Sequence, residues 1–267
     1  MNATKRFSKA ALAAAVAAAV LGLAAVSAQA NLQWRVTDIG TGETFTVCDN
    51  NIGVGCLALG DLNPAPEVIT VDTTLINGLL TGKFDFTAAG ADDNILTATT
   101  LAVINSSFQV QVGTGGADIL IVEATRDGWL IPLGNPRTLT NGPSATLTQT
   151  AGSVASTGFN DGNNLLFGTQ FATATSTFIA GVAPCTPIVG EVSTCADLQQ
   201  LGGINESNPY SLTNRQDISS PAGDGPATYL VTDASTKFAS PIPEPTSLLL
   251  LGAGLAALGF GRRRKNA

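Results

Sequence analysis

Few side chains in this sequence could carry out acid–base, nucleophilic or metal chemistry. The 267 residues include no histidine, which removes the Ser-His-Asp triad, the Cys-His pair and the imidazole ligands of zinc and haem. The nearest approach to a Ser-x-x-Lys pair, Ser235-Thr236-Lys237, is one residue too short. We therefore find no catalytic residues and expect a protein that is not an enzyme and has no cofactor.

Carboxylates are the remaining candidates for catalysis. Two of them can flank the scissile bond of a sugar, and such pairs meet in space rather than in sequence. The eligible glutamates are Glu43, Glu67, Glu123, Glu191 and Glu206. Nothing singles out two of them, so we interpret all five as solvated acids of strand edges and loops.

One short segment begins like a calcium loop. Asp161-Gly162-Asn163-Asn164 supplies the first oxygen ligands, but Leu165 occupies the third ligand position of the pattern. An Asp-Gly turn between strands explains the segment more simply. Asp92-Asp93-Asn94 is interpreted as a turn in the same way. We predict no metal site, and calcium binding stays an alternative.

The two tryptophans are candidates for stacking on sugar rings. Trp34 and Trp129 are the only ones in the chain, and such a platform would need at least one of them outside the core. Trp129 follows a turn-forming Asp127-Gly128, but Leu130-Ile131 comes next, and burial is the usual place for an indole in that setting. We expect the Trp129 ring to pack in the core.

Four cysteines fall into two local groups. Cys48 and Cys56 flank one turn-rich segment, and Cys185 and Cys195 flank another. An even number of cysteines in an exported chain favours disulfides, although three connectivities are formally allowed. A zinc site is disfavoured because the C-x₂-C spacing and histidine are both missing. We expect the two local disulfides.

The first thirty residues have the three parts of a signal peptide. Lys5, Arg6 and Lys9 form a basic start, and an apolar run follows from residue 10 to 26. Ala28 and Ala30 then supply the small-x-small pattern of signal peptidase, so cleavage is expected after Ala30. An uncleaved membrane anchor is the alternative.

The C-terminal segment also has three parts. Pro243, Glu244 and Pro245 lie in a stiff, extended stretch, because each proline fixes φ. An apolar run over residues 248–260 follows, long enough for a helix of only about 20 Å against a hydrocarbon core of about 30 Å. A basic end closes the chain and should stay cytoplasmic. Its residues are Arg262, Arg263, Arg264 and Lys265.

This order of tripeptide, apolar helix and basic end resembles the C-terminal sorting region of PEP-CTERM proteins of Gram-negative bacteria. The resemblance covers about residues 241–267 and implies recognition of Pro243-Glu244-Pro245 by an exosortase, a membrane transpeptidase-like enzyme. It further implies an inner-membrane-anchored precursor that reaches the cell surface or the extracellular matrix, in association with exopolysaccharide or biofilm. A plain single-span anchor is the alternative, and the resemblance says nothing about residues 31–240.

The segment between these two ends is acidic and has a strand-like pattern. Residues 31–242 carry 19 acidic and six basic side chains, which argues against nucleic-acid binding. Runs with a two-residue period alternate with turn-forming clusters such as 113–116, 141–143 and 161–162. The expected strands are 68–71, 83–86, 108–112, 119–123, 146–150, 171–178, 210–213 and 229–232. Only residues 193–201 look helical, with a cap at Ser193 or Thr194.

Many short strands with almost no helix predict an antiparallel, jelly-roll-like β-sandwich. We expect its Phe and Val faces to point inward and its Thr, Gln and Asn faces outward. The expected division is a signal peptide (1–30), an acidic sandwich body (31–234), a linker (235–242) and a sorting region (243–267). A membrane β-barrel is disfavoured because the runs are short.

Two classes of function follow from this reading. The first is a surface or matrix protein with a structural, adhesive or exopolysaccharide-associated role, and with signal peptidase, exosortase and the membrane as its partners. The second is a secreted polysaccharide-active enzyme, or a carbohydrate- or calcium-binding module, with the same tail. The ligand and the oligomeric state cannot be read from the sequence.

Overall fold

Alternating burial shapes the long strands of this protein. In β7 (Arg137–Thr148) every second residue is buried, starting with Arg137, Leu139 and Asn141. β5 (Leu101–Val112) alternates in the same way. This period of two places one set of side chains on each face of a sheet.

The computed structural model describes residues 31–53, 55–94, 101–130, 135–148, 152–188, 192–222 and 226–240.

Two antiparallel sheets make up the fold. The seven-stranded sheet has the order β10-β8-β14-β6-β1-β2, with β9 paired to β8. Its strands are β1 (Gln33–Asp38), β2 (Glu43–Cys48), β6 (Asp118–Trp129), β8 (Ser153–Asp161), β9 (Phe171–Ala172), β10 (Ser176–Ile179) and β14 (Tyr210–Ser220).

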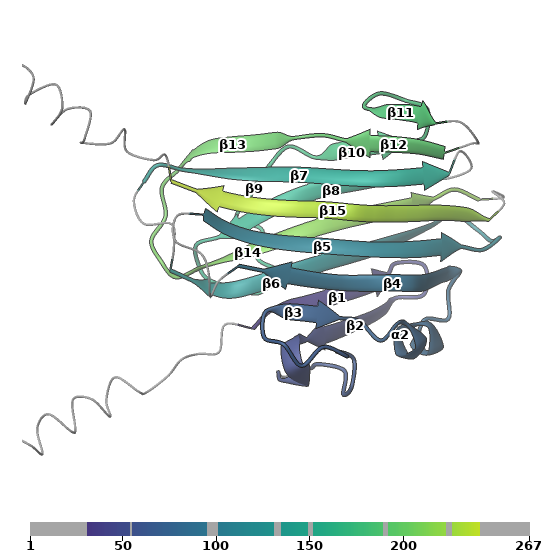
Figure 1. Ribbon diagram of the computed structural model, residues 1–267, viewed down its shortest axis with the longest axis horizontal. Helices are drawn as coiled ribbons and strands as arrows, with labels where there is room; N and C mark the ends of the chain where they lie inside the picture. The colour runs from purple at the N-terminus through teal and green to yellow at the C-terminus, as the bar shows by residue number, and fades with distance from the viewer. Residues whose placement is uncertain are drawn as a thin grey trace, which may run out of the picture.

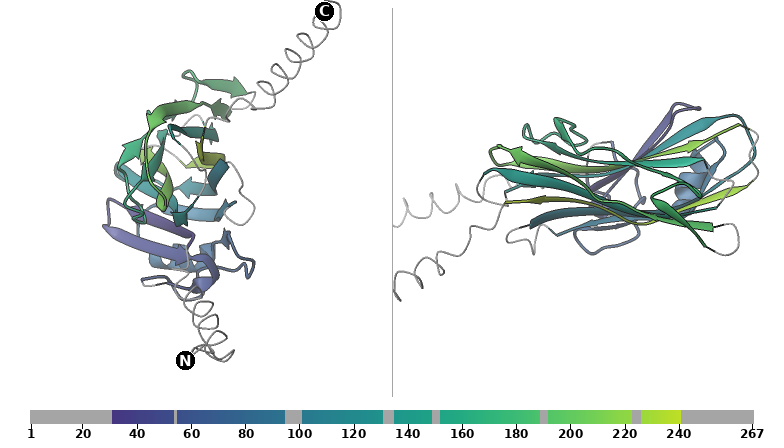
Figure 2. Two further views of the ribbon diagram at one scale, coloured as in Figure 1. Left: turned by 90° about the vertical axis from the view of Figure 1, so that its left-hand side faces the viewer. Right: turned by 90° about the horizontal axis from the view of Figure 1, so that it is seen from above.

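The eight-stranded sheet has the order β11-β12-β7-β15-β5-β4-β3, with β13 also paired to β7. Besides β5 and β7 its strands are β3 (Val68–Thr70), β4 (Phe84–Asp93), β11 (Cys185–Ile188), β12 (Val192–Ala196), β13 (Gln199–Ile204) and β15 (Ala227–Ala239). It lies in front of the seven-stranded sheet in Figure 1, and the two layers are seen from above in Figure 2. The predicted antiparallel β-sandwich is confirmed.

Aromatic side chains fill much of the space between the sheets. Trp34 meets Phe86 edge to face at 5.6 Å between ring centroids, and Phe86 meets Phe108 at 6.3 Å. Tyr210 and Phe238 form a third edge-to-face pair at 5.0 Å. Because these residues come from both sheets, their contacts hold the two layers together.

Both expected disulfides are present. Cys48, the last residue of β2, is bonded to Cys56. Cys185 and Cys195 are directly opposed in the β11–β12 pair and are bonded to each other. The two bridges therefore staple an edge loop of one sheet and an edge hairpin of the other.

The helix predicted over residues 193–201 is wrong. This segment supplies β12 and the start of β13, and both strands pair with β7. Buried Ser193 and Cys195 alternate with exposed neighbours, so pairing and the disulfide override a weak helical pattern. The helix of the described residues is α2 (Thr73–Leu79), which begins where Asp72 Oδ1 accepts a hydrogen bond from the Leu75 N–H at 3.1 Å. A single 3₁₀ turn, η1, spans Asp49–Asn51.

Two predicted turns are also wrong. Residues 141–143 lie inside β7, and Asp92 and Asp93 end β4. The turns at 113–116 and at Asp161-Gly162 are confirmed, since β5 ends at residue 112 and β8 at residue 161. The predicted strand over 171–178 is split into β9 and β10, and β1, β2 and β8 were not predicted at all.

The inward face is more polar than expected. Asn141, Asn214 and Thr236 are fully buried between the sheets, although we expected such residues outside.

β15 continues through Ala239, so residues 235–239 belong to the sandwich rather than to the linker. The predicted signal peptide, the sorting tripeptide, the apolar run and its basic end lie outside the described residues. Within the described ranges no helix has the length and hydrophobicity needed to cross a membrane.

Candidate functional site

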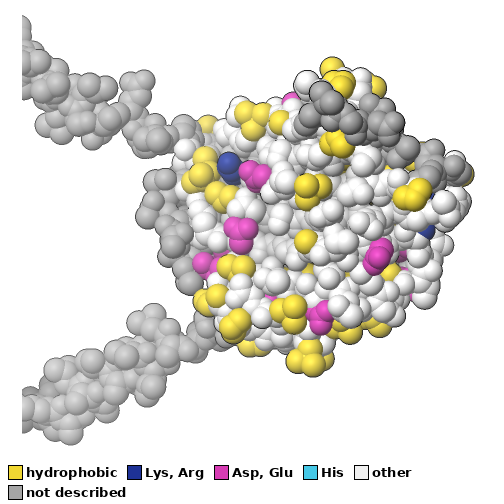
Figure 3. Space-filling view, turned by 45° about the vertical axis from the view of Figure 1, so that its right-hand side comes forward, with side chains coloured by type: hydrophobic (Ala, Val, Ile, Leu, Met, Phe, Trp, Pro, Cys, Tyr) yellow, Lys and Arg dark blue, Asp and Glu magenta, His cyan; other side chains and the backbone are white. Residues whose placement is uncertain are grey.

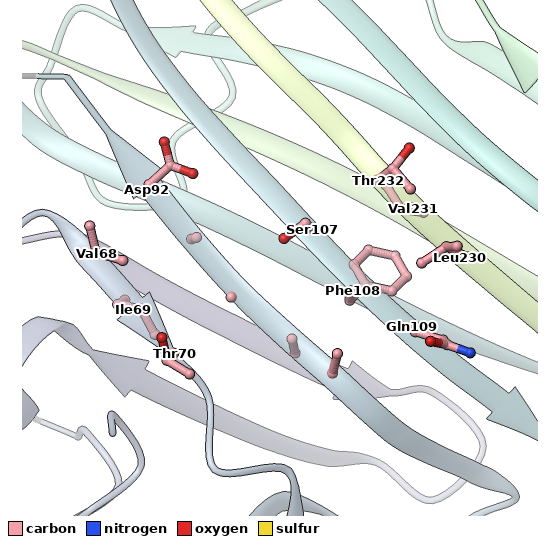
Figure 4. Close-up of a pocket in the computed structure, with 14 residues that line it drawn as sticks. Val68, Ile69, Thr70, Asp92, Ser107, Phe108, Gln109, Leu230, Val231 and Thr232 are labelled. Carbon is pink, nitrogen blue, oxygen red and sulfur yellow. The ribbon is translucent and has the colours of Figure 1, made fainter. Parts of the chain in front are cut away.

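A groove crosses the outer face of the eight-stranded sheet. It consists of two adjoining hollows of about 440 and 420 Å³ over β4, β5 and β15. The two hollows share Asp92, Ser107 and Thr232. Figure 4 shows the first hollow, with β3 on one side and β15 on the other. We call the two hollows together the outer groove.

Small residues in β4 form one side of the outer groove. Ala88, Ala89, Gly90 and Ala91 follow one another, and β4 carries a bulge between Phe86 and Ala88. Gly90 is also needed for packing, because a methyl group there would lie 2.6 Å from the backbone carbonyl oxygen of Ile69 in β3. The run of small side chains therefore leaves the hollow open and lets β3 approach.

Hydrogen-bonding groups line the second hollow. Asn105 donates a hydrogen bond to Asp92 Oδ2 at 2.8 Å across β5 and β4. A bulge in β15 between Val231 and Ala234 leaves Thr232 and Asp233 both exposed at the groove. Bulges often redirect side chains at binding sites. Lys237 adds one ammonium group to the lining.

This lining suits a neutral ligand rich in hydroxyl groups. Carboxylates accept hydrogen bonds, amides both donate and accept them, and Ser and Thr hydroxyls do either. Leu230 and Val68 provide small apolar contacts beside them. The molecular face in Figure 3 is mostly uncharged, with its acidic side chains spaced apart. The outer groove combines these properties with an open shape.

The two tryptophans lie elsewhere. Trp34 and Trp129 are fully buried, which confirms the prediction for Trp129 and removes both rings as a sugar platform. The described part of the outer groove therefore offers hydroxyl and amide groups rather than exposed indole rings.

The four candidate glutamates that the structure describes have separate environments. Glu123 is buried and accepts a 2.8 Å hydrogen bond from Arg35 Nε. Hydrogen bonds from the backbone and side chain of Thr81 lower the pKa of Glu43. Glu67 is buried, and Glu191 lies outside the described residues.

Glu206 is buried at the end of the sandwich where β8 stops. Its backbone is held by Asn135, whose amide donates to the Glu206 carbonyl at 3.2 Å and accepts from the Glu206 N–H at 3.3 Å. Burial raises the pKa of Glu206, nearby Asp161 adds to the rise, and the positive charge of Arg137 opposes it. The structure thus places Glu206 beside the Asp161-Gly162 turn, a proximity that sequence reasoning missed.

The acidic side chains do not gather into a cluster of three or more that could hold a metal ion in the part of the chain that the structure describes. The acids of the Cys48–Cys56 region are used structurally instead. Asp61, for example, accepts hydrogen bonds from the backbone N–H groups of Asn50, Asn63 and Thr70.

Comparison with known proteins gives one family match. Residues 241–265 match the PEP-CTERM protein-sorting motif. No curated protein matches the sequence. Among solved structures, one chain is described as "Structural basis for the promiscuous specificity of the carbohydrate-binding modules from the beta-sandwich super family". It is 12% identical with a TM-score of 0.26, and the match covers 76% of this chain and 72% of that one.

The family match coincides with the residues that carried the resemblance in the sequence. It contains Pro243, Glu244, Pro245 and the basic end through Lys265. A PEP-CTERM motif implies sorting by an exosortase. This chain is therefore a PEP-CTERM domain-containing protein, with its sorting motif at residues 241–265.

Proposed function

We propose that this protein is exported, anchored by its C-terminal tail as an inner-membrane precursor, and processed by an exosortase to become a surface or matrix protein. The match of residues 241–265 to the sorting motif carries this proposal. Signal peptidase would act after Ala30 and exosortase at Pro243-Glu244-Pro245. The body would then work outside the cell without catalytic activity of its own.

The position of the last strand supports such a tethered arrangement. β15 ends at Ala239, and the motif match begins at residue 241. β15 lies between β7 and β5 in the middle of its sheet, so the strand next to the tail is held on both sides. Its end and the beginning of β1 lie at the same end of the sandwich, on the left of Figure 1.

We infer that the body contacts exopolysaccharide through the outer groove. The groove lies on an outer sheet face and presents the Asp92–Asn105 pair beside Ser107, Gln109 and Thr232. These groups match the alternating donors and acceptors of sugar hydroxyls, and the open shape admits a chain rather than only a small molecule. The role would be adhesive or structural.

Replacing the acidic residue of the tripeptide tests the sorting. In the producing bacterium, Glu244→Ala should leave the precursor uncleaved in the membrane fraction, whereas Asp85→Ala, which removes an exposed acid from the body, should mature normally. Immunoblotting of membrane, surface and culture fractions reports the result. Normal maturation of the Glu244→Ala protein would refute the proposal.

A second candidate function is a secreted polysaccharide-active enzyme with the same tail. Incubating the full-length protein with a panel of polysaccharides separates the possibilities. New reducing ends would indicate an enzyme, and retention without cleavage would indicate a binding module. If the protein neither cleaves nor retains any of the polysaccharides, a purely structural role remains.

A further inference from the structure

The loop after β8 and the residue Glu206 together form a cluster of oxygen atoms that the proposed function does not use. β8 ends at Asp161, and the chain then passes through Gly162 toward Gln170 before β9 begins. Gly162 N–H donates to Gln170 Oε1 at 2.9 Å, which folds the loop back on itself. Glu206 reaches this loop from the segment before β14, where Asn135 fixes its backbone.

The carboxylate of Glu206 is buried and unpaired. The residue is 8% exposed, and neither Oε1 nor Oε2 accepts a hydrogen bond from any described residue. The Asn160 and Gly162 N–H groups lie near the carboxylate and oppose the rise in its pKa, while their own hydrogen bonds are donated to Ser211 O and Gln170 Oε1. Asn160 is fully buried, and its own Oδ1 also lacks a partner. Buried oxygen atoms left unpaired are costly unless a bound ion or water satisfies them.

Glycine leaves room beside these oxygens. A methyl group on Gly162 would lie 2.7 Å from Glu206 Oε1 and 3.3 Å from Gln170 Oε1. A methyl group on Gly168 would lie 2.1 Å from Asp161 Oδ2, so this carboxylate also faces a glycine. Gln170 is exposed, which gives the cluster a route to solvent.

We propose that this cluster is a calcium site, with Asp161 and Glu206 as its carboxylate ligands and Gln170 as an amide ligand. Calcium takes six to eight oxygen ligands from carboxylates, amide carbonyls, backbone and water, in flexible geometry. The site contains two carboxylates only, and the positive charge of Arg137 lies nearby, so it belongs with weak extracellular sites that bind at about 0.1–1 mM. Its position at the β8 end would let calcium join the 161–170 loop to the segment before β14.

Thermal unfolding of the full-length chain in detergent tests the site. After removal of divalent cations, 10 mM CaCl₂ should raise the Tm by about 3–10 °C. Glu206→Gln keeps the size of the side chain and removes its charge, so it should reduce this rise to less than half. Asp85→Asn, which removes one exposed acid elsewhere, should keep the full rise and serves as the matched control. NaCl at equal ionic strength should not reproduce the calcium effect.

Equilibrium dialysis with ⁴⁵Ca²⁺ gives a second readout that does not depend on stability. One calcium ion should bind per chain, and Glu206→Gln should weaken binding at least tenfold while its circular dichroism spectrum stays that of the unchanged protein. Equal calcium binding by Glu206→Gln and the unchanged chain would overturn the proposal, since it would show only diffuse attraction to an acidic surface. Absence of binding at 10 mM would overturn it as well.

Discussion

Asn214 on β14 donates a hydrogen bond of 3.1 Å to Asn141 Oδ1 on β7, which links the two sheets through the middle of the sandwich. Asn214 also donates to Thr236 Oγ1 at 2.9 Å, and Asn141 donates to Ser156 Oγ at 3.1 Å. All four residues are fully buried. Gly158 makes room for the network, because a methyl group there would lie 2.8 Å from Thr236 Oγ1. These bonds form only when the two sheets are correctly aligned.

Removing Asn214 should therefore weaken the fold strongly. Asn214→Ala leaves buried polar groups of Asn141 and Thr236 without partners, and we expect the free energy of unfolding to fall by about 2–4 kcal/mol. Urea denaturation followed by tryptophan fluorescence measures the change. Asn205→Ala, at an exposed position, should change it by less than about 0.5 kcal/mol. Equal effects of the two variants would show that the network contributes nothing specific.

The Cys185–Cys195 bridge should stabilise the fold by restricting the conformations of the unfolded chain. Replacing both cysteines by serine frees a loop of about eleven residues, and the chain-entropy model predicts a loss of about 2.5–3 kcal/mol. Urea midpoints of the variant and of the oxidised protein provide the comparison. The fully reduced protein should have a lower urea midpoint than the variant, because reduction also breaks the Cys48–Cys56 bridge. An unchanged midpoint in the variant would contradict a stabilising role.

The outer groove should bind polysaccharide through Asp92. Asp92→Ala removes the carboxylate and leaves Asn105 without its 2.8 Å partner, so affinity should fall about tenfold. Asp85→Ala is the matched control, since Asp85 is an exposed acid of the same strand that does not line the groove. Affinity electrophoresis in gels that contain the producing strain's exopolysaccharide measures both. Equal retention of the two variants would remove the groove as the contact.

Glu206 should make the stability of the calcium-free protein depend on pH. Because burial raises the pKa of Glu206 above 4.5, the folded protein keeps this proton to higher pH than the unfolded chain does. Stability due to this group is therefore fully present below pH 4.5 and is lost as pH rises through the folded-state pKa. Glu206→Gln lacks this loss, so its stability relative to the unchanged protein should increase with pH over that window. Parallel pH profiles measured in chelator would contradict the prediction.

Local patterns predicted the fold class but not the interior of the sandwich. The alternation in β5 and the spacing of the four cysteines each depend on near neighbours, and these predictions are confirmed. Asn141-Gly142-Pro143 looked like a turn because its residue types favour turns. In the structure, pairing with β15 keeps the segment extended, and Asn214 from the other sheet satisfies the Asn141 side chain.

The candidate sites depend on contacts between distant segments. Nothing local in the sequence joins Asp92 to Thr232, or Glu206 to Gly162, because strand order and loop packing bring them together. The sorting motif is the opposite case. Its residues are contiguous, so Pro243-Glu244-Pro245 and the basic end could be recognised directly from the sequence.

The intact mass of the mature protein, taken from the producing cell's surface or medium, tests the central claim most directly. We predict a chain that begins at Asn31, ends within or near Pro243-Glu244-Pro245, and is lighter by four hydrogens because of its two disulfides. Any added group at the new C-terminus would appear as extra mass. A surface-exposed or released protein that still extends to Ala267 would contradict processing by an exosortase.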